Sequence, residues 1–255
     1  MSSFPTLRTV AALMFREMAS TYGRSPGGYV WSILEPVGSI ALMSALFSLG
    51  FRTPQLGVNF PIYYASGLLP FFMFIHISQK MMQSLSYSRQ LLAYPRVTII
   101  DALLARFILN VLTELLSACL ILAGILLIFN TGTTLILTDI ILGFTMAAAL
   151  AVGIGTLNCL LVSLTPIWRN VWSVVTRPLM IISGILFLFD SVPEPYRGYL
   201  WYNPLVHAVG AVRRGFYYSY TADYVTPLYP FSVALITGAV GLLFLKRYHR
   251  DILEI

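Results

Sequence analysis

The sequence predicts an all-α integral membrane protein with six transmembrane helices. The chain has 255 residues, of which 58% are hydrophobic and 10% are charged. Its mean hydropathy of +0.79 is too high for a water-soluble domain of ordinary composition. Six apolar segments also reach the length of about 20 residues that is needed to cross about 30 Å of hydrocarbon. No internal repeat is present, so we expect a single transmembrane domain over residues 1–255.

Residues 1–28 are predicted to form a helix that lies on the membrane surface, followed by a joint. Apolar side chains from Leu7 onward recur at helical spacing, while Arg16 and Glu17 lie off that face. This pattern is typical of an amphipathic interfacial helix. A soluble helix packed against a partner is the alternative. Glycine and proline residues between positions 23 and 28 then prevent a continuous helix into the first span.

The predicted spans cover residues 30–51, 61–83, 103–129, 139–164, 171–189 and 227–245. The fifth is the weakest, because Arg177 and Pro178 interrupt it. Five spans with one re-entrant segment is therefore an alternative. Span four has small residues at four-residue intervals, which permit close packing within the chain or across a dimer. They are Gly143, Ala147, Ala151 and Gly155.

Basic residues indicate which side of the membrane each connection occupies. Of the 16 Lys and Arg residues, twelve fall on one side of the predicted spans and four on the other. Connections rich in Lys and Arg stay in the cytoplasm. We therefore expect a multi-pass protein with both termini in the cytoplasm, as an even number of spans also requires.

Motifs for catalysis and nucleotide binding are absent from the sequence. There is no glycine-rich loop ending in Lys-Ser or Lys-Thr, no His-Glu-x-x-His and no Gly-x-Ser-x-Gly, so the chain is not expected to be an enzyme or to hold a cofactor. Cys119 and Cys159 lie in apolar runs and are interpreted as core residues, so no metal site is predicted. The net charge is +6, but the basic residues are scattered, which argues against a nucleic-acid partner.

Charged residues inside the predicted spans are candidates for a conduit or a substrate site. Glu114 lies well inside span three, where an ionised carboxylate is costly unless it faces protein or water. Its expected partner is Arg177, His76 or Lys80, in a structural ion pair or hydrogen bond rather than a substrate relay. Glu35 precedes a proline near the start of span one, where it either braces the helix or lines a path. Arg177 is itself a conduit candidate.

Residues 190–224 are too many and too aromatic for a simple external turn. Asn203 and Pro204 divide them into two predicted helices, which we expect to dip back into the outer leaflet. The conduit or substrate candidates here are Trp201, Tyr202, Arg213 and Arg214. The rings can stack on sugars, and the arginines can attract an acidic glycan or a lipid headgroup. An interfacial aromatic belt is the alternative explanation for the rings.

Three short motifs resemble the permease subunits of type-2 ABC exporters, most closely the inner-membrane proteins that export capsular polysaccharide. The first is Thr-Tyr-Gly-Arg-Ser-Pro-Gly-Gly-Tyr-Val-Trp-Ser-Ile-Leu-Glu-Pro at residues 21–36, and the second is Tyr-Pro-Arg-Val at residues 94–97. The third runs from 201 to 207 and from 213 to 216. The Leu-Glu-Pro ending of the first motif favours capsule over other glycans. The family pattern has an acidic residue near the position of Gly210, so no role for a carboxylate is expected there.

The resemblance implies the membrane-spanning permease subunit of an ATP-driven exporter of lipid-linked capsular polysaccharide, in the bacterial inner membrane. It implies a homodimer with two ATPase subunits, which bind ATP and Mg²⁺. Periplasmic and outer-membrane export proteins are the further partners that it implies. A permease for O-antigen or teichoic acid is the nearest alternative, followed by a drug or small-lipid exporter and an ion-coupled secondary transporter.

The connection at residues 84–96, between spans two and three, is expected to couple the permease to its ATPase. Residues 85–93 can form a short helix that ends before Pro95. The resemblance implies that this segment docks on the ATPase through Leu85, Arg89, Leu91, Leu92, Tyr94, Pro95 and Arg96. A plain solvated loop is the alternative.

Overall fold

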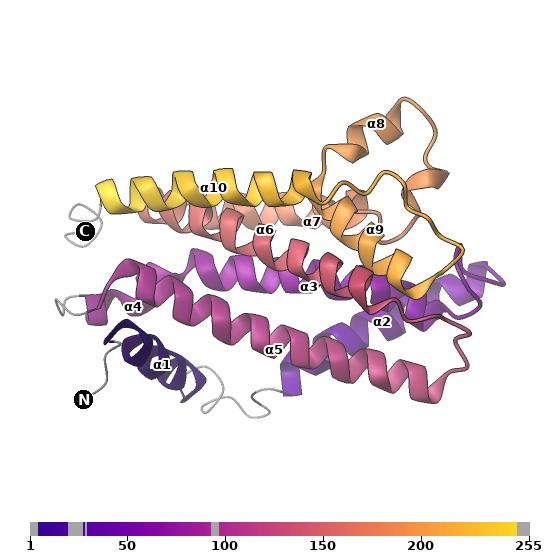
Figure 1. The fold of residues 1–255 in the computed structure, drawn as a ribbon, viewed down its shortest axis with the longest axis horizontal. Coiled ribbons are helices and arrows are strands. Elements are labelled where there is room, and N and C mark those ends of the chain that lie inside the picture. The colour runs from indigo at the N-terminus through magenta and orange to yellow at the C-terminus, as the bar shows by residue number, and fades with distance from the viewer. Residues whose placement is uncertain (1–4, 20–27, 29, 93–96, 249–255) are drawn as a thin grey trace.

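The computed structural model describes residues 5–19, 28, 30–92 and 97–248, and these form helices and connections without a β-strand (Figure 1). In chain order the elements are α1 (Pro5–Glu17), α2 (Val30–Gly50), α3 (Phe60–Met82), α4 (Ser84–Leu92), α5 (Ile99–Ile128), α6 (Leu137–Leu164), α7 (Trp168–Ile182), the 3₁₀ helix η2 (Phe189–Ser191), α8 (Tyr196–Trp201), α9 (Pro204–Phe216) and α10 (Leu228–Arg247). The all-α prediction is confirmed for this part of the chain.

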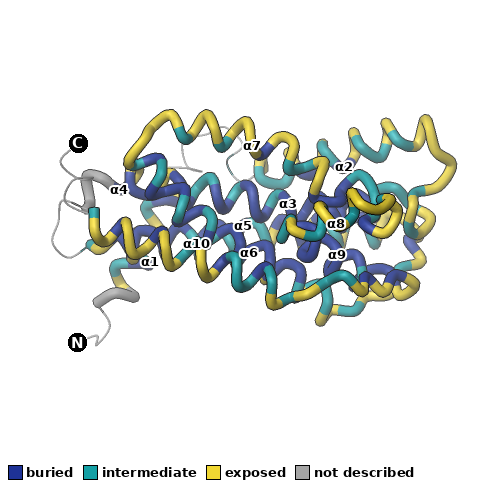
Figure 2. Tube along the Cα trace, turned by 90° about the horizontal axis from the view of Figure 1, so that it is seen from above, coloured by how far each residue is buried: buried dark blue, intermediate teal, exposed yellow. Residues whose placement is uncertain are grey.

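Five of the described helices are long and apolar enough to cross a membrane, namely α2, α3, α5, α6 and α10. Helix α3 forms the centre of the bundle, since 78% of its most apolar stretch is buried, against 11% for α2 and 22% for α10. Its side chains, including Tyr63, Phe74 and Ile77, belong to one core with residues of α5, α6 and α9. Figure 2 shows buried residues along the inner helices and exposed ones along α2 and α7.

Small residues of α6 bring neighbouring helices into close contact. A Cβ added to Gly153 would collide with the backbone of Ala234 in α10, and one added to Gly143 would collide with Val212 in α9. Gly155 approaches α3 in the same way. The small residues of span four therefore pack within the chain, as the first of the two predicted alternatives requires.

The prediction of six spans is not confirmed, because the segment expected to be span five is helical over only part of its length. Helix α7 has 15 residues, about 22 Å at 1.5 Å per residue. Pro178 lies inside it without ending it. The break comes after Ile182, where Gly184 has φ +73°. Both views nevertheless show α7 alongside the bundle, leading from the end near α4 towards the end with α8 and α9.

Helix α1 forms where it was predicted, and one of its faces packs on the chain itself. Val10 and Leu13 are buried against Ala105 of α5, while Phe15 is 71% exposed. Glu17, which the sequence places off the apolar face, is only 4% exposed. A position of α1 in the membrane interface stays a prediction.

The two ends of the bundle carry different elements. Helices α1 and α4 and the last turn of α10 lie at one end, and α8 and α9 lie at the other (Figure 1). Helix α8 ends at Trp201 and α9 begins at Pro204, as predicted. Asn203 caps α9, because its Oδ1 accepts a hydrogen bond of 3.1 Å from the backbone N–H of Leu205. Most of α9 is buried, and a re-entrant position in the bilayer stays a prediction.

Candidate functional site

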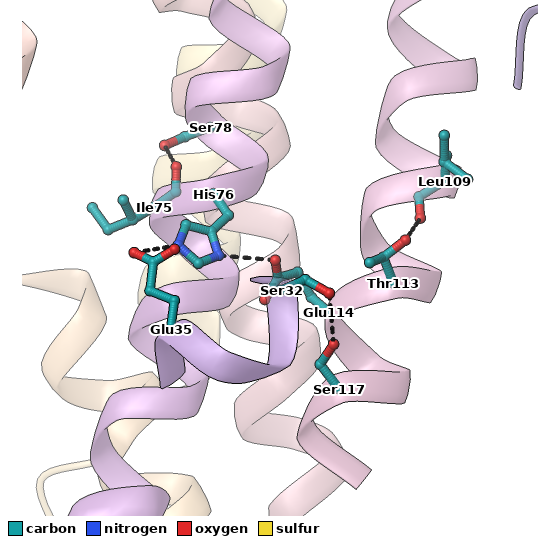
Figure 3. Close-up of polar contacts among 9 residues, drawn as sticks. All are labelled: Ser32, Glu35, Ile75, His76, Ser78, Leu109, Thr113, Glu114 and Ser117. Carbon is teal, nitrogen blue, oxygen red and sulfur yellow. Dashed lines mark hydrogen bonds and ion pairs between the residues drawn. The ribbon is translucent and has the colours of Figure 1, made fainter. Parts of the chain in front are cut away.

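A polar cluster joins three helices inside the bundle (Figure 3). The imidazole of His76 on α3 lies between two carboxylates. Its Nδ1 is 2.9 Å from Oε1 of Glu114 on α5, and its Nε2 is 3.7 Å from Oε1 of Glu35 on α2. Beside it, the hydroxyls of Ser32 on α2 and Ser117 on α5 are 3.4 Å apart. The cluster therefore ties α2, the least buried candidate span, to α3 and α5.

The geometry of His76 determines how many protons the cluster holds. A neutral imidazole has an N–H at one nitrogen and a lone pair at the other. Both nitrogens face a carboxylate here, so a lone pair would oppose a negative charge. Both contacts are attractive when the imidazole carries two protons or when one carboxyl is protonated. With the imidazole doubly protonated and both carboxylates ionised, the cluster has one net negative charge.

Among the three partners predicted for Glu114, the structure selects His76. Arg177 lies exposed on α7, and neither it nor Lys80 pairs with Glu114 in the described part of the chain. The side chain of Glu35 is 60% exposed, against 11% for Glu114. Glu35 is therefore the member of the cluster that reaches the surface of the bundle.

Arg213 is 2% exposed and donates hydrogen bonds to three backbone carbonyls of the segment that follows α7. Its Nη1 is 2.6 Å from the oxygen of Gly184 and 3.1 Å from that of Phe187, and its Nη2 is 2.7 Å from that of Ile185. The ring of Tyr63 lies 4.5 Å from the guanidinium carbon. Because a buried backbone carbonyl needs a hydrogen-bond partner, Arg213 stabilises the break after α7.

Arg214 forms a bidentate ion pair with Asp139 in the first turn of α6. Nε lies 2.9 Å from Oδ2 and Nη2 lies 2.7 Å from Oδ1, which is the stronger and more specific geometry for this pair of groups. Arg213 and Arg214 thus both have partners within the chain. The side chain of Arg214 remains 29% exposed. Attraction of a glycan or headgroup by these arginines stays a prediction.

Aromatic residues surround His207 of α9 at the end of the bundle that carries α8. Trp201 lies edge-on to the imidazole at 5.2 Å and stacks on Tyr229 at 5.0 Å, while Tyr202 is 67% exposed. Nε2 of His207 is 2.9 Å from the oxygen of Trp201, and its Nδ1 is 3.1 Å from the backbone N of Thr226. Since a backbone N–H only donates, Nδ1 accepts and Nε2 carries the proton. Burial lowers the pKa of His207, and the hydrogen bond to the oxygen of Trp201 offsets only part of this.

At the opposite end of the bundle, Arg106 of α5 connects α1 with α4. Its Nε lies 3.4 Å from Oε2 of Glu17, and both side chains are 5% exposed. Its Nη1 donates a hydrogen bond of 2.6 Å to the backbone oxygen of Lys80. The guanidinium carbons of Arg106 and Arg16 lie 4.2 Å and 5.0 Å from the centre of the Tyr87 ring on α4. Tyr87 is therefore held by cations from two helices.

The predicted coupling segment is described only in part. Helix α4 forms over Ser84–Leu92, and Leu85 is buried at 5% exposure in the main core, which anchors α4 on the bundle. The structure does not describe the side chains of Arg89, Leu91 and Leu92. The other predicted docking positions, Tyr94, Pro95 and Arg96, lie outside the described residues altogether. Docking on an ATPase stays a prediction.

Sequence reasoning gave no role to several residues that make these contacts. The sequence places Asp139 at the start of predicted span four and does not name its partner. An acidic residue at the outer end of a span, on the side with few basic residues, was a signal for pairing with Arg213 or Arg214. No comparable signal indicated that Glu17 pairs with Arg106, because the two lie far apart in the chain.

Comparison with known proteins identifies the chain's relatives. The family model described as ABC-2 type transporter matches residues 8–217. The polysialic acid transport protein KpsM of Escherichia coli is 30% identical over 237 residues, which cover 92% of this chain and 91% of that protein. The capsule polysaccharide export inner-membrane protein CtrC of Neisseria meningitidis serogroup A is 24% identical over 246 residues, or 96% and 92% of the two chains. BexB of Haemophilus influenzae, also named as a capsule polysaccharide export inner-membrane protein, is 20% identical over 245 residues, with the same coverage of 96% and 92%.

We expect His76→Leu to lower the free energy of unfolding by about 3 to 5 kcal/mol, because Glu114 is then left buried without its partner. The double variant His76→Leu with Glu114→Leu should recover most of this loss, since the only carboxylate left without His76 is that of Glu35, which is 60% exposed. Denaturant unfolding of the purified proteins in detergent measures both. Wild-type stability in the single variant would contradict the assignment of a coupled pair.

Acid is expected to weaken the packing of α8 and α9 through His207. Its pKa is depressed in the folded protein, so its contribution to stability is complete above about pH 6.5 and is lost as the pH falls below that value. Glutamine keeps a donor and an acceptor but does not titrate. The stability advantage of wild type over His207→Gln should therefore shrink between about pH 7.5 and about pH 5.5, as followed by thermal unfolding. A constant difference would rule out the neutral tautomer.

Proposed function

This chain belongs to the ABC-2 type transporter family, and on that premise we propose that it is the membrane-spanning permease subunit of an ATP-driven exporter of lipid-linked capsular polysaccharide. The observation that carries the substrate class is similarity over nearly the full length to proteins named for polysialic acid transport and capsule polysaccharide export. The chain is a transport subunit, and hydrolysis of ATP with Mg²⁺ takes place in a partner.

The permease works as a homodimer in this proposal, with α2 at the conduit. Helix α2 is the least buried candidate span, yet it carries Glu35, whose side chain is 60% exposed. An ionised carboxylate facing the centre of the bilayer costs about 2.5 to 3.5 kcal/mol. A second copy placed against α2 encloses a water-filled path and removes that cost. Glu35 then lines the path, with His76 and Glu114 behind it.

Two ATPase subunits dock on α4 of the two copies. The contact of Tyr87 with Arg106 supports this role, because it ties α4 to α5. Glu114 lies about two helical turns further along α5. A push on α4 therefore reaches the polar cluster along a single helix, and it displaces Glu114 against His76. Glu35, which contacts His76 from the side of the path, then moves with it.

The proposed topology has six crossings and both termini in the cytoplasm. Helix α7 and the segment after it make the remaining crossing, with Arg213 pairing the carbonyls that the break leaves free. The end of the bundle with α1 and α4 then lies in the cytoplasm and the end with α8 and α9 in the periplasm. Tyr196 and Tyr199 of α8, which are 66% and 73% exposed, face the glycan and the periplasmic and outer-membrane export proteins. We assign the protein to the bacterial inner membrane.

Replacing both Leu91 and Leu92 with Asp is expected to abolish surface polysaccharide and copurification of the ATPase, because charged side chains on α4 would prevent its docking. A strain lacking the gene, complemented with tagged variants, supplies both measurements. Val58→Asp, exposed at the opposite end of the bundle, is the control and should leave both unchanged. Normal export with a bound ATPase in the double variant would exclude α4 as the docking element. If the wild-type gene does not restore surface polysaccharide, the substrate class is wrong.

Glu35→Gln is expected to lower surface polysaccharide by about tenfold, a change of about 1.4 kcal/mol, because the contact of its charge with His76 is lost. The amide keeps the shape of the side chain and removes its charge from the path. Asp223→Asn, an exposed carboxylate on an external loop, is the matched control. Unchanged export by Glu35→Gln, at equal levels of permease and ATPase, would remove Glu35 from the conduit.

A further inference from the structure

The cluster of Glu35, His76 and Glu114 has a place for a proton in each of its two contacts (Figure 3). Each proton lies between a ring nitrogen and a carboxylate oxygen, and the count is the same whichever atom carries it. With two protons, both contacts are attractive. With one proton, a lone pair of the imidazole opposes a carboxylate, and the cluster changes from one net negative charge to two.

The contact with Glu35 is the one that loses its proton. Nδ1 of His76 lies 2.9 Å from Glu114, whose side chain is only 11% exposed, so the last proton stays in this buried hydrogen bond. Nε2 lies 3.7 Å from Glu35, whose side chain is 60% exposed. Loss of one proton therefore makes the contact between α3 and α2 repulsive, while the contact between α3 and α5 remains.

No other charged group of the described helices around α3 contacts these carboxylates. Glu35 is the one charged residue of α2. Lys80 follows His76 by one turn of α3 and pairs with neither carboxylate in the described part of the chain. Other titratable groups on α5, α6 and α9 have their own partners, namely Asp101, Arg106, Asp139, His207, Arg213 and Arg214.

The segment of α2 that carries Glu35 is attached to the bundle by few contacts. The buried residues of α2 are Pro36 and Ile40, which both come after it. Pro36 lies inside the helix and cannot donate the helical hydrogen bond to the carbonyl of Ser32, which makes it a point where the helix bends easily. The hydroxyls of Ser32 and Ser117, 3.4 Å apart, form a second polar contact of this segment. Residues 30–35 can therefore swing about Pro36.

We propose that the cluster is a proton-dependent latch on α2. With two protons it holds residues 30–35 against α3, and release of one proton lets this segment swing away about Pro36. Exchange of this proton with water rests on the proposed function, in which Glu35 lines a water-filled path, whereas the contacts of the latch do not. The position of α2 beside the path then depends on pH, held in acid and released in base.

Cysteine cross-linking between α2 and α5 tests the latch. Ser32→Cys with Ser117→Cys places two thiols where the hydroxyls lie 3.4 Å apart. Cys119 and Cys159 are both replaced by alanine in this protein. Disulfide formation with copper phenanthroline is followed for the full-length purified permease in nanodiscs, from about pH 5.5 to about pH 8.5. Because the thiolate fraction also rises with pH, each rate is divided by the rate of the same pair with Glu35→Gln, which leaves no carboxylate to repel.

We expect this ratio to fall by about threefold or more between the two ends of the pH range, the effect of one partly exposed ion pair. With His76→Gln in both proteins the ratio should stay constant, because glutamine does not titrate. Pro36→Ala restores the helical hydrogen bond and should reduce the fall. Pro178→Ala, which removes the proline inside α7, is its control and should leave the fall unchanged.

Several outcomes would overturn the latch. A constant ratio with His76 present would mean that no proton controls the contact, and a ratio that rises with pH would mean that the deprotonated cluster holds α2. A fall that persists with His76→Gln would assign the effect to another group, and an undiminished fall with Pro36→Ala would refute the hinge. The rates need neither glycan nor ATPase, so these failures are distinct from failure of the wild-type gene to restore surface polysaccharide.

Discussion

The hydrogen bonds from Arg213 to the backbone after α7 are the contact on which the end of the bundle with α8 and α9 depends. A buried carbonyl without a partner is costly, so a helix can break inside a folded protein only where donors are supplied. The guanidinium supplies them to Gly184, Ile185 and Phe187, and Tyr63 holds it from α3. This break ends α7. It also accompanies the burial of α9 and the position of α8 at one end of the bundle.

Charged groups elsewhere in the bundle obey the same constraint. The ion pair of Glu17 with Arg106 joins α1 to α5, and the contact of His76 with Glu114 joins α3 to α5. Such pairs contribute little net stability, but the loss of one partner is costly. We interpret them as contacts that specify which helices lie side by side. Because both involve α5, that helix connects the end of the bundle that carries α1 and α4 with the polar cluster.

The amount of structure that could be predicted varies along the chain. Hydrophobic length located α2, α3, α5, α6 and α10, because the cost of placing polar residues in hydrocarbon is a property of each segment alone. The division of the external segment at Asn203 was predictable for a similar reason, since its cap and the following proline act locally. The fifth predicted span is not confirmed, because α7 ends at Ile182 and hydropathy does not register an arginine that arrives from another helix. Glu17, which the helical pattern places off the apolar face, is buried because Arg106 meets it there.

The sequence by itself determined the membrane class, the approximate spans and the family, since these depend on composition, periodicity and short motifs of neighbouring residues. The tertiary structure alone decided that Glu114 meets His76 and not Arg177, and that Arg213 faces inward while Arg214 meets Asp139. The physical reason is that hydrogen bonds and ion pairs act over about 3 to 4 Å, so their partners are defined only when helices far apart in the chain are brought together.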